Sequence, residues 1–556
     1  MAILPNFGAA TFIPRAPIDN PYLPLIPGHV LSYMGDEIDP DTGEVTTERN
    51  DLFTTSATFE VRGVATTVIR DTVYEDDVIL EDTFDWYAQD TAGNVWYFGE
   101  IVINYEYDDD GNFTGVNHDG EWSADDPGNQ PGWAMKASPE FGPAYYLEFA
   151  PGIAEDESII AETGLSVKTA FGQFDDVIKI IDSSALSTGV EFKYYAPGVG
   201  EITELAVAPD GSTTSKVDLY RKGQVGVADP DDTDDVTPAL AKLHEGKAVK
   251  DLADVRDLDV ADFTGTTKEV TVIGGSTDSV DALGAYYFDA ATGGISEARI
   301  LLPDLSEVVR GSSVVVDVPE GQTLGLFLVR GVDEIGVDLE QFTDGGLHLT
   351  NLLTGLPASM TDLYAPTIMD DAGNILPIQP LSALGAADGS NLLNPAGSLQ
   401  AIGLSSTVEG AEGIEIVGFE DRLNTSPEYD GDFNDAIVAV SDTPIAATTL
   451  QQLLIEAGGS KPSSPVGDLL AANPSNDALE GWMASDSFQF SEGALSAERI
   501  ADAGKGIMAA DFAAAFGDEA FAYDDGLGGT DVIGDRGTGI DVAGVTSLGA
   551  DGFFFT

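Results

Sequence analysis

The sequence predicts a mainly β protein with two antiparallel β-sandwich or curved-sheet domains and a small helical C-terminal region. Short runs rich in Val, Thr, Tyr and Phe recur along the chain, and these residues favour strands. Turn formers separate the runs, and the 63 glycines suit tight hairpins. The length of 556 residues exceeds what one core usually serves, so more than one domain is expected.

The N-terminal part divides into an arm and a domain. Residues 1–20 are rich in Pro, Phe and Asn and show no helical period. They are expected to form an extended arm that lies along a sheet edge, either of this chain or of a second subunit. Residues 21–225 are expected to form a β-rich domain. Polar and aromatic residues alternate most clearly over 191–195, as in a half-buried antiparallel strand.

The remaining segments are assigned by changes in composition. An acidic run between Asp229 and Asp235 marks a solvated linker. We divide the rest as follows: residues 226–262, the acidic linker with a short helix from Thr237 to about Val255; residues 263–445, a β-sandwich of calcium-binding type; residues 446–525, a helical region with helices at 448–457, 494–503 and 509–516; residues 526–556, a Gly/Asp-rich tail.

The charge balance restricts the partners. Lys and Arg number 24 against 96 Asp and Glu, which gives a formal net charge of −72. Such a surface repels nucleic acid and anionic lipid, so we expect no nucleic-acid partner. A saline environment explains the acidity, because salt screens the self-repulsion. Many divalent-cation sites are the other explanation, and both fit an extracellular bacterial protein.

The chain contains no cysteine, which excludes zinc-thiolate sites, iron–sulfur clusters and cysteine nucleophiles. A secreted protein without disulfides must rely on its core or on metal. No apolar segment is long enough to span a bilayer, so no membrane span is expected. The last residues, Asp551 to Thr556, resemble the uncleaved signal of type I secretion substrates, and an ordinary terminal strand is the alternative. We therefore expect an extracellular or cell-surface location.

The strongest site candidate lies just before the apolar run 436–440. Acidic and amide side chains, all short oxygen ligands, gather within sixteen residues among loop formers. Ca2+ takes about six to eight such oxygens from a flexible turn. The alternative is a polar turn that caps strands through Asx hydrogen bonds. We predict Ca2+ as the cofactor, with five metal ligands: Glu420, Asp421, Asp432, Asn434 and Asp435.

Two segments resemble bacterial families. Residues 20–205 are similar to an uncharacterised family of secreted β-rich proteins, through the motifs 20–25, 81–90, 93–100 and 194–200. This resemblance implies a curved antiparallel sheet and no activity.

The second resemblance concerns the predicted β-sandwich. The motifs 283–287, 324–329 and above all 418–421 with 432–435 make residues 263–445 similar to the bacterial family called domain of unknown function 4114. The resemblance implies a secreted or surface protein thought to bind calcium. An insertion, Arg422 to Tyr429, replaces the shorter turn of that family and leaves the participation of Asp430 open.

Three further segments have an Asp- and Gly-rich composition that is typical of cation-binding loops. Residues 528–535 resemble one turn of a calcium-binding nonapeptide repeat, but a single copy favours a lone loop. Residues 39–44 and 108–112 lack the terminal Glu that an EF-hand requires. Hairpin turns on an acidic surface are the favoured interpretation of both.

Catalytic motifs are scarce, so the protein is not expected to be an enzyme. The four histidines lack metal-site spacing, and neither a Gly-x-Ser-x-Gly elbow nor a phosphate loop is present. With 96 acidic residues, spacing cannot select a carboxylate pair for glycoside hydrolysis. The aromatic cluster around Trp86, Trp96, Trp122 and Trp133 could stack on sugars, but interleaved aromatics favour core packing.

These observations predict a secreted or cell-surface structural protein that is stabilised by calcium and assembles with copies of itself into a fibre, sheath or extracellular matrix. Cell-surface glycans are the second class of partner considered. The alternatives are a secreted polysaccharide-active hydrolase and a carbohydrate-binding adhesin that stacks sugars on exposed Trp86 or Trp122.

Overall fold

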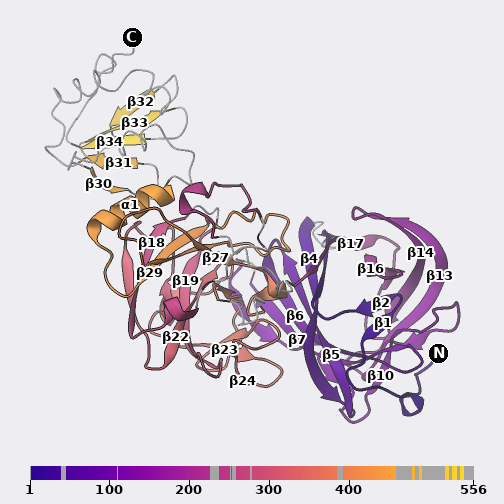
Figure 1. Ribbon diagram of the computed structural model, residues 1–556. Helices are drawn as coiled ribbons and strands as arrows, with labels where there is room; N and C mark the ends of the chain where they lie inside the picture. Colours follow the sequence, from indigo (N-terminus) through magenta and orange to yellow (C-terminus); the bar gives the residue numbers. More distant parts are fainter. Residues whose placement is uncertain are drawn as a thin grey trace.

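The computed structural model describes most of the chain, and antiparallel sheets dominate it, as predicted (Figure 1). The described residues are 2–38, 45–108, 110–225, 237–250, 252, 258, 260–275, 279–384, 392–458, 479–482, 487–490, 520–524, 529–534 and 539–543.

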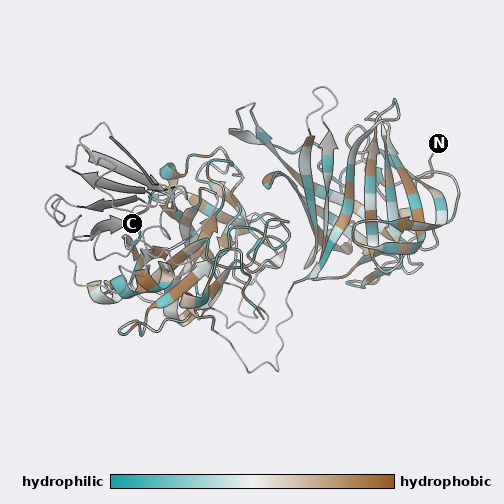
Figure 2. Ribbon diagram, turned by 90° about the horizontal axis from the view of Figure 1, so that it is seen from above, coloured by the Kyte–Doolittle hydropathy of each residue, from teal (hydrophilic) through white to brown (hydrophobic). Residues whose placement is uncertain are grey.

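One antiparallel sheet of 15 strands forms the N-terminal domain. Hydrophilic and hydrophobic residues alternate in bands along its strands (Figure 2), as a sheet with two different faces requires. Its strands are β3 His29–Ile38, β4 Val45–Val61, β5 Val64–Glu75, β6 Val78–Gln89, β7 Val95–Tyr107, β8 Phe113–Asn117, β9 Trp122–Ser123, β10 Gln130–Met135, β11 Tyr145–Tyr146, β12 Glu148–Phe149, β13 Asp156–Lys168, β14 Gln173–Ser184, β15 Val190–Ala196, β16 Gly200–Val207 and β17 Thr213–Gln224.

This sheet curls until its two ends meet. Strand β11 pairs with β13 at one end of the strand order, and β12, which follows β11 almost immediately, pairs with β10 at the other end. Register shifts interrupt the β4–β5 and β13–β14 pairings, and such bulges increase local twist and bend a sheet. The resemblance of residues 20–205 implied a curved antiparallel sheet, and the structure has one.

The N-terminal arm packs on its own domain. Ile3 bridges to Tyr145, and a 3-10 turn, η1 Phe7–Ala9, places the Phe7 ring against Trp96 and Phe98 at centroid distances of 5.9 and 5.8 Å. The arm ends in strand β1 Ile18–Asn20, which pairs with β2 Leu23–Leu25. Of the two expected positions, this structure has the one on the same chain.

The described part of the linker corrects the expected helix. Over 237–250 the structure has one short 3-10 turn, η2 Leu240–Lys242. Ala239 forms a parallel bridge with Ser405, and the Leu240 backbone N–H donates to the Ser405 carbonyl at 2.9 Å. This extended pairing replaces helical hydrogen bonds, while Leu240 and Leu243 still enter a core, as the apolar spacing indicated. The acidic run 229–235 lies outside the described residues.

The second domain is a β-sandwich, as predicted. One sheet has five strands in the order β21-β18-β29-β28-β27 and the other has seven. The strands of the first are β18 Thr267–Gly274, β21 Ser313–Asp317, β27 Ala401–Leu404, β28 Glu415–Phe419 and β29 Ala436–Ser441. Those of the second are β19 Ala282–Asp289, β20 Ile295–Leu302, β22 Gln322–Val329, β23 Leu347–Asn351, β24 Leu356–Pro357, β25 Thr367–Asp370 and β26 Leu381–Ser382. Three 3-10 turns accompany them: η4 Val260–Phe263, η5 Leu339–Phe342 and η6 Pro395–Gly397.

The sandwich core continues into the N-terminal domain. Tyr74, Ile79 and Tyr105 belong to the same cluster of buried side chains as the residues between the two sandwich sheets. The Arg70 guanidinium donates to the Ala365 carbonyl across the boundary at 2.9 Å. The two domains are therefore packed together through a shared apolar core.

The C-terminal part is helical only at its start. Helix α1 Ala447–Gly458 confirms the helix expected at 448–457. It is followed by a five-stranded sheet of β30 Leu479–Trp482, β31 Ser487–Phe490, β32 Ala520–Asp524, β33 Gly529–Gly534 and β34 Gly539–Ala543.

These strands correct the expectation of a helical region over 446–525. Polar and aromatic residues alternate in 487–490 and apolar and aromatic residues follow each other in 520–524, and aromatics favour strands over helices. The helices expected at 494–503 and 509–516, and the C-terminal residues 551–556, lie outside the described residues. Among the described helices, none is long and apolar enough to cross a membrane.

Candidate metal centre

The candidate site is the loop 420–435, which joins two hydrogen-bonded strands in the middle of the five-stranded sheet. Phe419 in β28 pairs with Ala436 in β29, so the two ends of the loop start side by side. Phe433 holds the loop from inside, because its ring is fully buried and its backbone has a φ of 55°. Gly418 permits the crossing, since a Cβ there would lie 2.4 Å from the Phe433 carbonyl oxygen.

Three of the predicted ligands come together at this point. Carboxylate oxygens of Glu420, Asp432 and Asp435 all lie within 4.8 Å of one another. Glu420 and Asp432 are each 1% exposed. One oxygen of Glu420, Oε2, is buried and has no hydrogen-bond partner within the described part of the chain.

Asn434, the fourth predicted ligand, directly precedes Asp435 in the sequence. Its side chain is buried, with 1% exposure. Neither its amide oxygen nor its amide nitrogen has a hydrogen-bond partner among the described residues. Leaving a buried polar group unpaired costs about 1–3 kcal/mol. The polar turn considered as the alternative would use these side chains to accept backbone hydrogen bonds. Asp432 Oδ1 does so from the Asn434 backbone N–H at 3.0 Å, and Asp435 Oδ2 does so from the Asp421 backbone N–H at 2.8 Å. Glu420 Oε2 and the Asn434 amide have no such partner among the described residues.

Asp421, the fifth predicted ligand, lies outside the three-carboxyl group. Its backbone N–H donates to Asp435 Oδ2 at 2.8 Å, while its own Oδ2 accepts a hydrogen bond from Ser279 Oγ at 2.8 Å. Asp421 therefore supports the position of Asp435 and faces residues near the start of β19.

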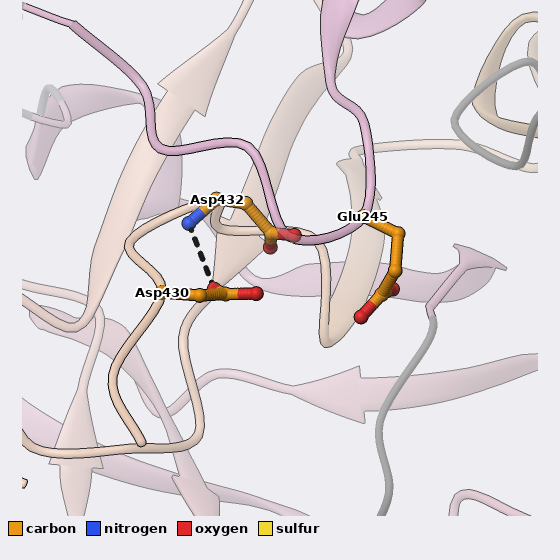
Figure 3. A group of neighbouring side chains, drawn as sticks. All are labelled: Glu245, Asp430 and Asp432. Carbon is orange, nitrogen blue, oxygen red and sulfur yellow. Dashed lines mark hydrogen bonds between the residues drawn. The ribbon is translucent and has the colours of Figure 1, made fainter. Parts of the chain in front are cut away.

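A second group of carboxylates adjoins the first and shares Asp432 with it (Figure 3). Its other members are Glu245, which the sequence analysis missed, and Asp430, whose participation was open. Asp430 Oδ1 accepts from the Asp432 backbone N–H at 3.2 Å. The Gly246 backbone N–H donates to Asp432 Oδ2 at 2.7 Å and so brings the segment 237–250 to the loop.

The electrostatics of the first group disfavour three ionised carboxyls without a counter-charge. Burial, followed by the charges of Asp430 and Asp421, raises the pKa of Glu420 to about 8. Burial raises the pKa of Asp432 to about 7, and burial with Asp421 and Glu420 raises that of Asp435 to about 10. A nearby cation reverses such shifts. Buried hard oxygens with no thiolate or imidazole fit Ca2+ among the common protein metals.

One of the three further Asp- and Gly-rich segments, residues 108–112, has the structure that its favoured interpretation predicts. The Asp108 carboxylate accepts from the backbone N–H groups of Asp110 and Asn112, at 3.0 and 2.9 Å, which makes residues 108–112 a hairpin turn. Residues 529–534 form strand β33, which pairs antiparallel with β32 and β34. This corrects the lone loop expected for residues 528–535, and it also differs from a turn of a parallel roll. The loop 39–44 lies outside the described residues.

The aromatic cluster of the N-terminal domain is core. Trp86 is 4% exposed and stacks on Phe59 at a centroid distance of 4.6 Å, and Trp122 is 2% exposed. Neither ring offers the exposed face that a sugar-stacking adhesin would use.

No family model matches the chain, and no curated protein matches it, so both family resemblances stay predictions. Two solved structures are similar to part of it. A candidate exported protein with a YmcC-like fold from Bacteroides fragilis is 14% identical, with 36% of this chain and 99% of that chain covered and a TM-score of 0.21. A candidate lipoprotein from Parabacteroides distasonis is 14% identical, with coverages of 37% and 100% and a TM-score of 0.19. Likeness at these TM-scores carries no argument.

The raised pKa values predict how the effect of calcium depends on pH. In the folded chain without cation, Asp432 and Glu420 keep their protons up to about pH 7 and 8, whereas unfolded carboxyls lose theirs near pH 4. The folded state then binds more protons than the unfolded state, so stability without cation falls as pH rises through this window. Because protons and Ca2+ compete, we expect the calcium-induced rise in melting temperature to grow between about pH 5 and pH 8. Scanning calorimetry in Ca2+ and in EDTA measures this, and a shift that is constant over the range contradicts it.

Proposed function

We propose that this protein is an extracellular or cell-surface structural protein whose β-sandwich is stabilised by Ca2+ at the loop 420–435. One observation carries the proposal: a three-carboxyl group, with Glu420 and Asp432 buried and Asp435 half-buried, in which Glu420 Oε2 has no hydrogen-bond partner among the described residues. The proposed role is mechanical rather than catalytic. The acidic composition supports an extracellular setting, where salt screens the self-repulsion of the carboxylates.

The three carboxylate residues of the loop contact different parts of the structure. Glu420 and Asp435 extend from the ends of β28 and β29, so their positions report on the pairing of these two strands. Asp432 lies at the point where the segment 237–250 reaches the loop. A bound Ca2+ ion supplies the positive charge that lets the three carboxyls ionise together. Binding to the folded chain alone then adds to the free energy of unfolding, by about 2.7 kcal/mol when Ca2+ is at 100 times its dissociation constant.

The Glu420→Gln variant separates a cation site from a merely structural cluster. The substitution removes one repelling charge and adds amide donors that can reach the neighbouring carboxylates. We therefore expect a melting temperature in EDTA equal to or above that of the wild type, and a calcium-induced shift reduced from roughly 5–10 °C to nearly none. Scanning calorimetry and isothermal titration of the full chain provide both readouts.

Glu412→Gln is the matched control, because Glu412 is an exposed carboxylate of the same domain. It should keep the wild-type response to Ca2+. If the wild-type chain gives no binding heat and melts identically in Ca2+ and EDTA, the proposal is wrong.

Self-association is the second part of the proposal, and it rests on the predicted extracellular structural role. Because the arm 2–20 is docked on its own domain, assembly would use other surfaces. We expect negative-stain electron microscopy of the full chain to show filaments or lattices in millimolar Ca2+ that disappear in EDTA. Dispersed single particles under both conditions would remove self-assembly from the proposal while leaving the cation site to its own test.

A polysaccharide-active hydrolase is the second candidate, and a carboxyl pair in the N-terminal domain favours it. Asp85 and Glu100 are direct neighbours across β6 and β7, and Tyr97 Oη donates to Asp85 Oδ1 at 2.6 Å. Tyr87 stacks on Tyr97 at a centroid distance of 4.7 Å. Burial, with Glu100 adding to it, raises the pKa of Asp85, and carboxyls with raised pKa values can act as general acids.

The structural role predicts that the chain turns over none of a panel of marine polysaccharides. Release of reducing sugar by the wild type, lost in Asp85→Asn and in Glu100→Gln at unchanged melting temperature, would establish the hydrolase instead.

A further inference from the structure

The insertion Arg422–Tyr429 connects Glu420 of the first carboxylate group to Asp430 of the second. Between these two ends it packs against the N-terminal domain. It begins directly after Glu420 and Asp421 and ends at Asp430. The sandwich holds its first residues in place, because Gln400 Nε2 donates to the carbonyls of both Glu420 and Arg422, at 3.0 and 2.8 Å. The backbone position of the insertion is therefore tied to that of Glu420.

The centre of the insertion contacts strand β4 of the N-terminal domain. Thr425 Oγ1 donates to Asp51 Oδ2 at 2.7 Å and accepts from Arg49 Nη1 at 2.9 Å. Arg49 and Asp51 also form an ion pair with each other, and all three side chains are at most 4% exposed. One hydroxyl thus completes a buried ion pair that belongs to the other domain.

The flanks of the insertion contact Asp77, in the turn between β5 and β6. Asp77 Oδ2 accepts from Arg422 Nη1 at 2.6 Å and from Ser426 Oγ at 3.0 Å, while Asp77 Oδ1 pairs with Arg49 at 3.0 Å. In β17, Arg221 Nη1 donates to Asn424 Oδ1 at 3.1 Å. These contacts are short, largely buried and charged, and such hydrogen bonds depend on both partners being held in position.

We propose that the insertion couples cation binding at the metal centre to docking of the N-terminal domain, so that Ca2+ acts as an interdomain latch. The inference rests on the proposed cation site. When Glu420, Asp432 and Asp435 repel one another, both ends of the insertion lose their fixed positions, and its contacts with Asp51 and Asp77 weaken. Coupling is reciprocal: docking raises the affinity of the centre for Ca2+ by the same factor by which Ca2+ favours docking.

The effect of docking on Ca2+ affinity is tested first by a substitution in the N-terminal domain, which holds none of the proposed ligands. Asp77→Asn keeps the size of the side chain and removes the charge that Arg422 and Arg49 share. Isothermal titration of the full chain with Ca2+ should show roughly fivefold or greater loss of affinity. Thr425→Val, which removes both hydrogen bonds to β4, is the second variant. Asp175→Asn is the matched control, because Asp175 is an exposed carboxylate of the same domain that is bonded to Ser166.

The direct effect is measured as a distance between the domains. The chain has no cysteine, so Thr163→Cys with Glu320→Cys introduces one spin label in each domain at exposed positions. Pulsed electron–electron double resonance should give a single narrow distance distribution in Ca2+ and a broader one in EDTA. In the Asp77→Asn background the distribution should be broad already at a Ca2+ concentration that narrows the wild type.

The outcomes distinguish failure of the interdomain latch from failure of the proposed cation site. Weakened Ca2+ affinity in Asp77→Asn, with a cation-dependent distance distribution, supports the latch. Normal Ca2+ binding with identical affinities in all variants and an unchanged distribution in EDTA overturns the latch and leaves the cation site intact. The absence of any Ca2+ binding to the wild type overturns both.

Discussion

The structure depends on one electrostatic constraint: two buried carboxyls and one half-buried carboxyl meet where β28 and β29 separate, and ionising all three without a neighbouring positive charge is unfavourable. Glu420 and Asp435 occupy adjacent ends of paired strands, so the backbone cannot move them apart without breaking the pair. Protonation relieves the repulsion up to about pH 7, and the proposed divalent cation would relieve it as the pH rises through the pKa values of Asp432 and Glu420. Among the described residues, Glu420 Oε2 and the amide of Asn434 have no hydrogen-bond partner, which distinguishes this cluster from ordinary surface acids.

Because of its position, the loop that carries these carboxyls contacts several distant parts of the chain. Strand β29 lies between β18 and β28, so the loop begins and ends in the interior of the five-stranded sheet. The same loop contacts the segment 237–250 through Asp432 and the N-terminal domain through Thr425 and Asp77. Three parts of the chain that are distant in sequence therefore converge on one group of carboxyls. In a chain with a net charge of −72, converging acidic segments need either screening or specific neutralisation.

Much of this arrangement was predictable from sequence, and what was missed has a physical cause. Glu420, Asp432 and Asp435 fall within one loop, so their spacing alone indicated that they could share a ligand. Glu245 could not be found in this way, because a backbone hydrogen bond from Gly246 brings it to Asp432 across a long stretch of chain. Asp421 was placed with the ligands because it adjoins Glu420, but Ser279 holds its carboxylate on another side. The strands at 487–490 and 520–524 were missed because alanines elsewhere in the region suggested helix, whereas the aromatic residues of both segments favour strands. The contact between the insertion and Asp51 could not be predicted from local sequence patterns, because it joins residues far apart in the chain.

The most direct test of the cation site is anomalous X-ray diffraction from crystals of the full chain grown with Mn2+ or Tb3+ in place of Ca2+. We predict an anomalous difference peak enclosed by the carboxylates of Glu420, Asp432 and Asp435, with the Asn434 amide turned towards it. A map without a peak at this position, in which the same carboxyls are linked to one another by shared protons or water, would contradict the account.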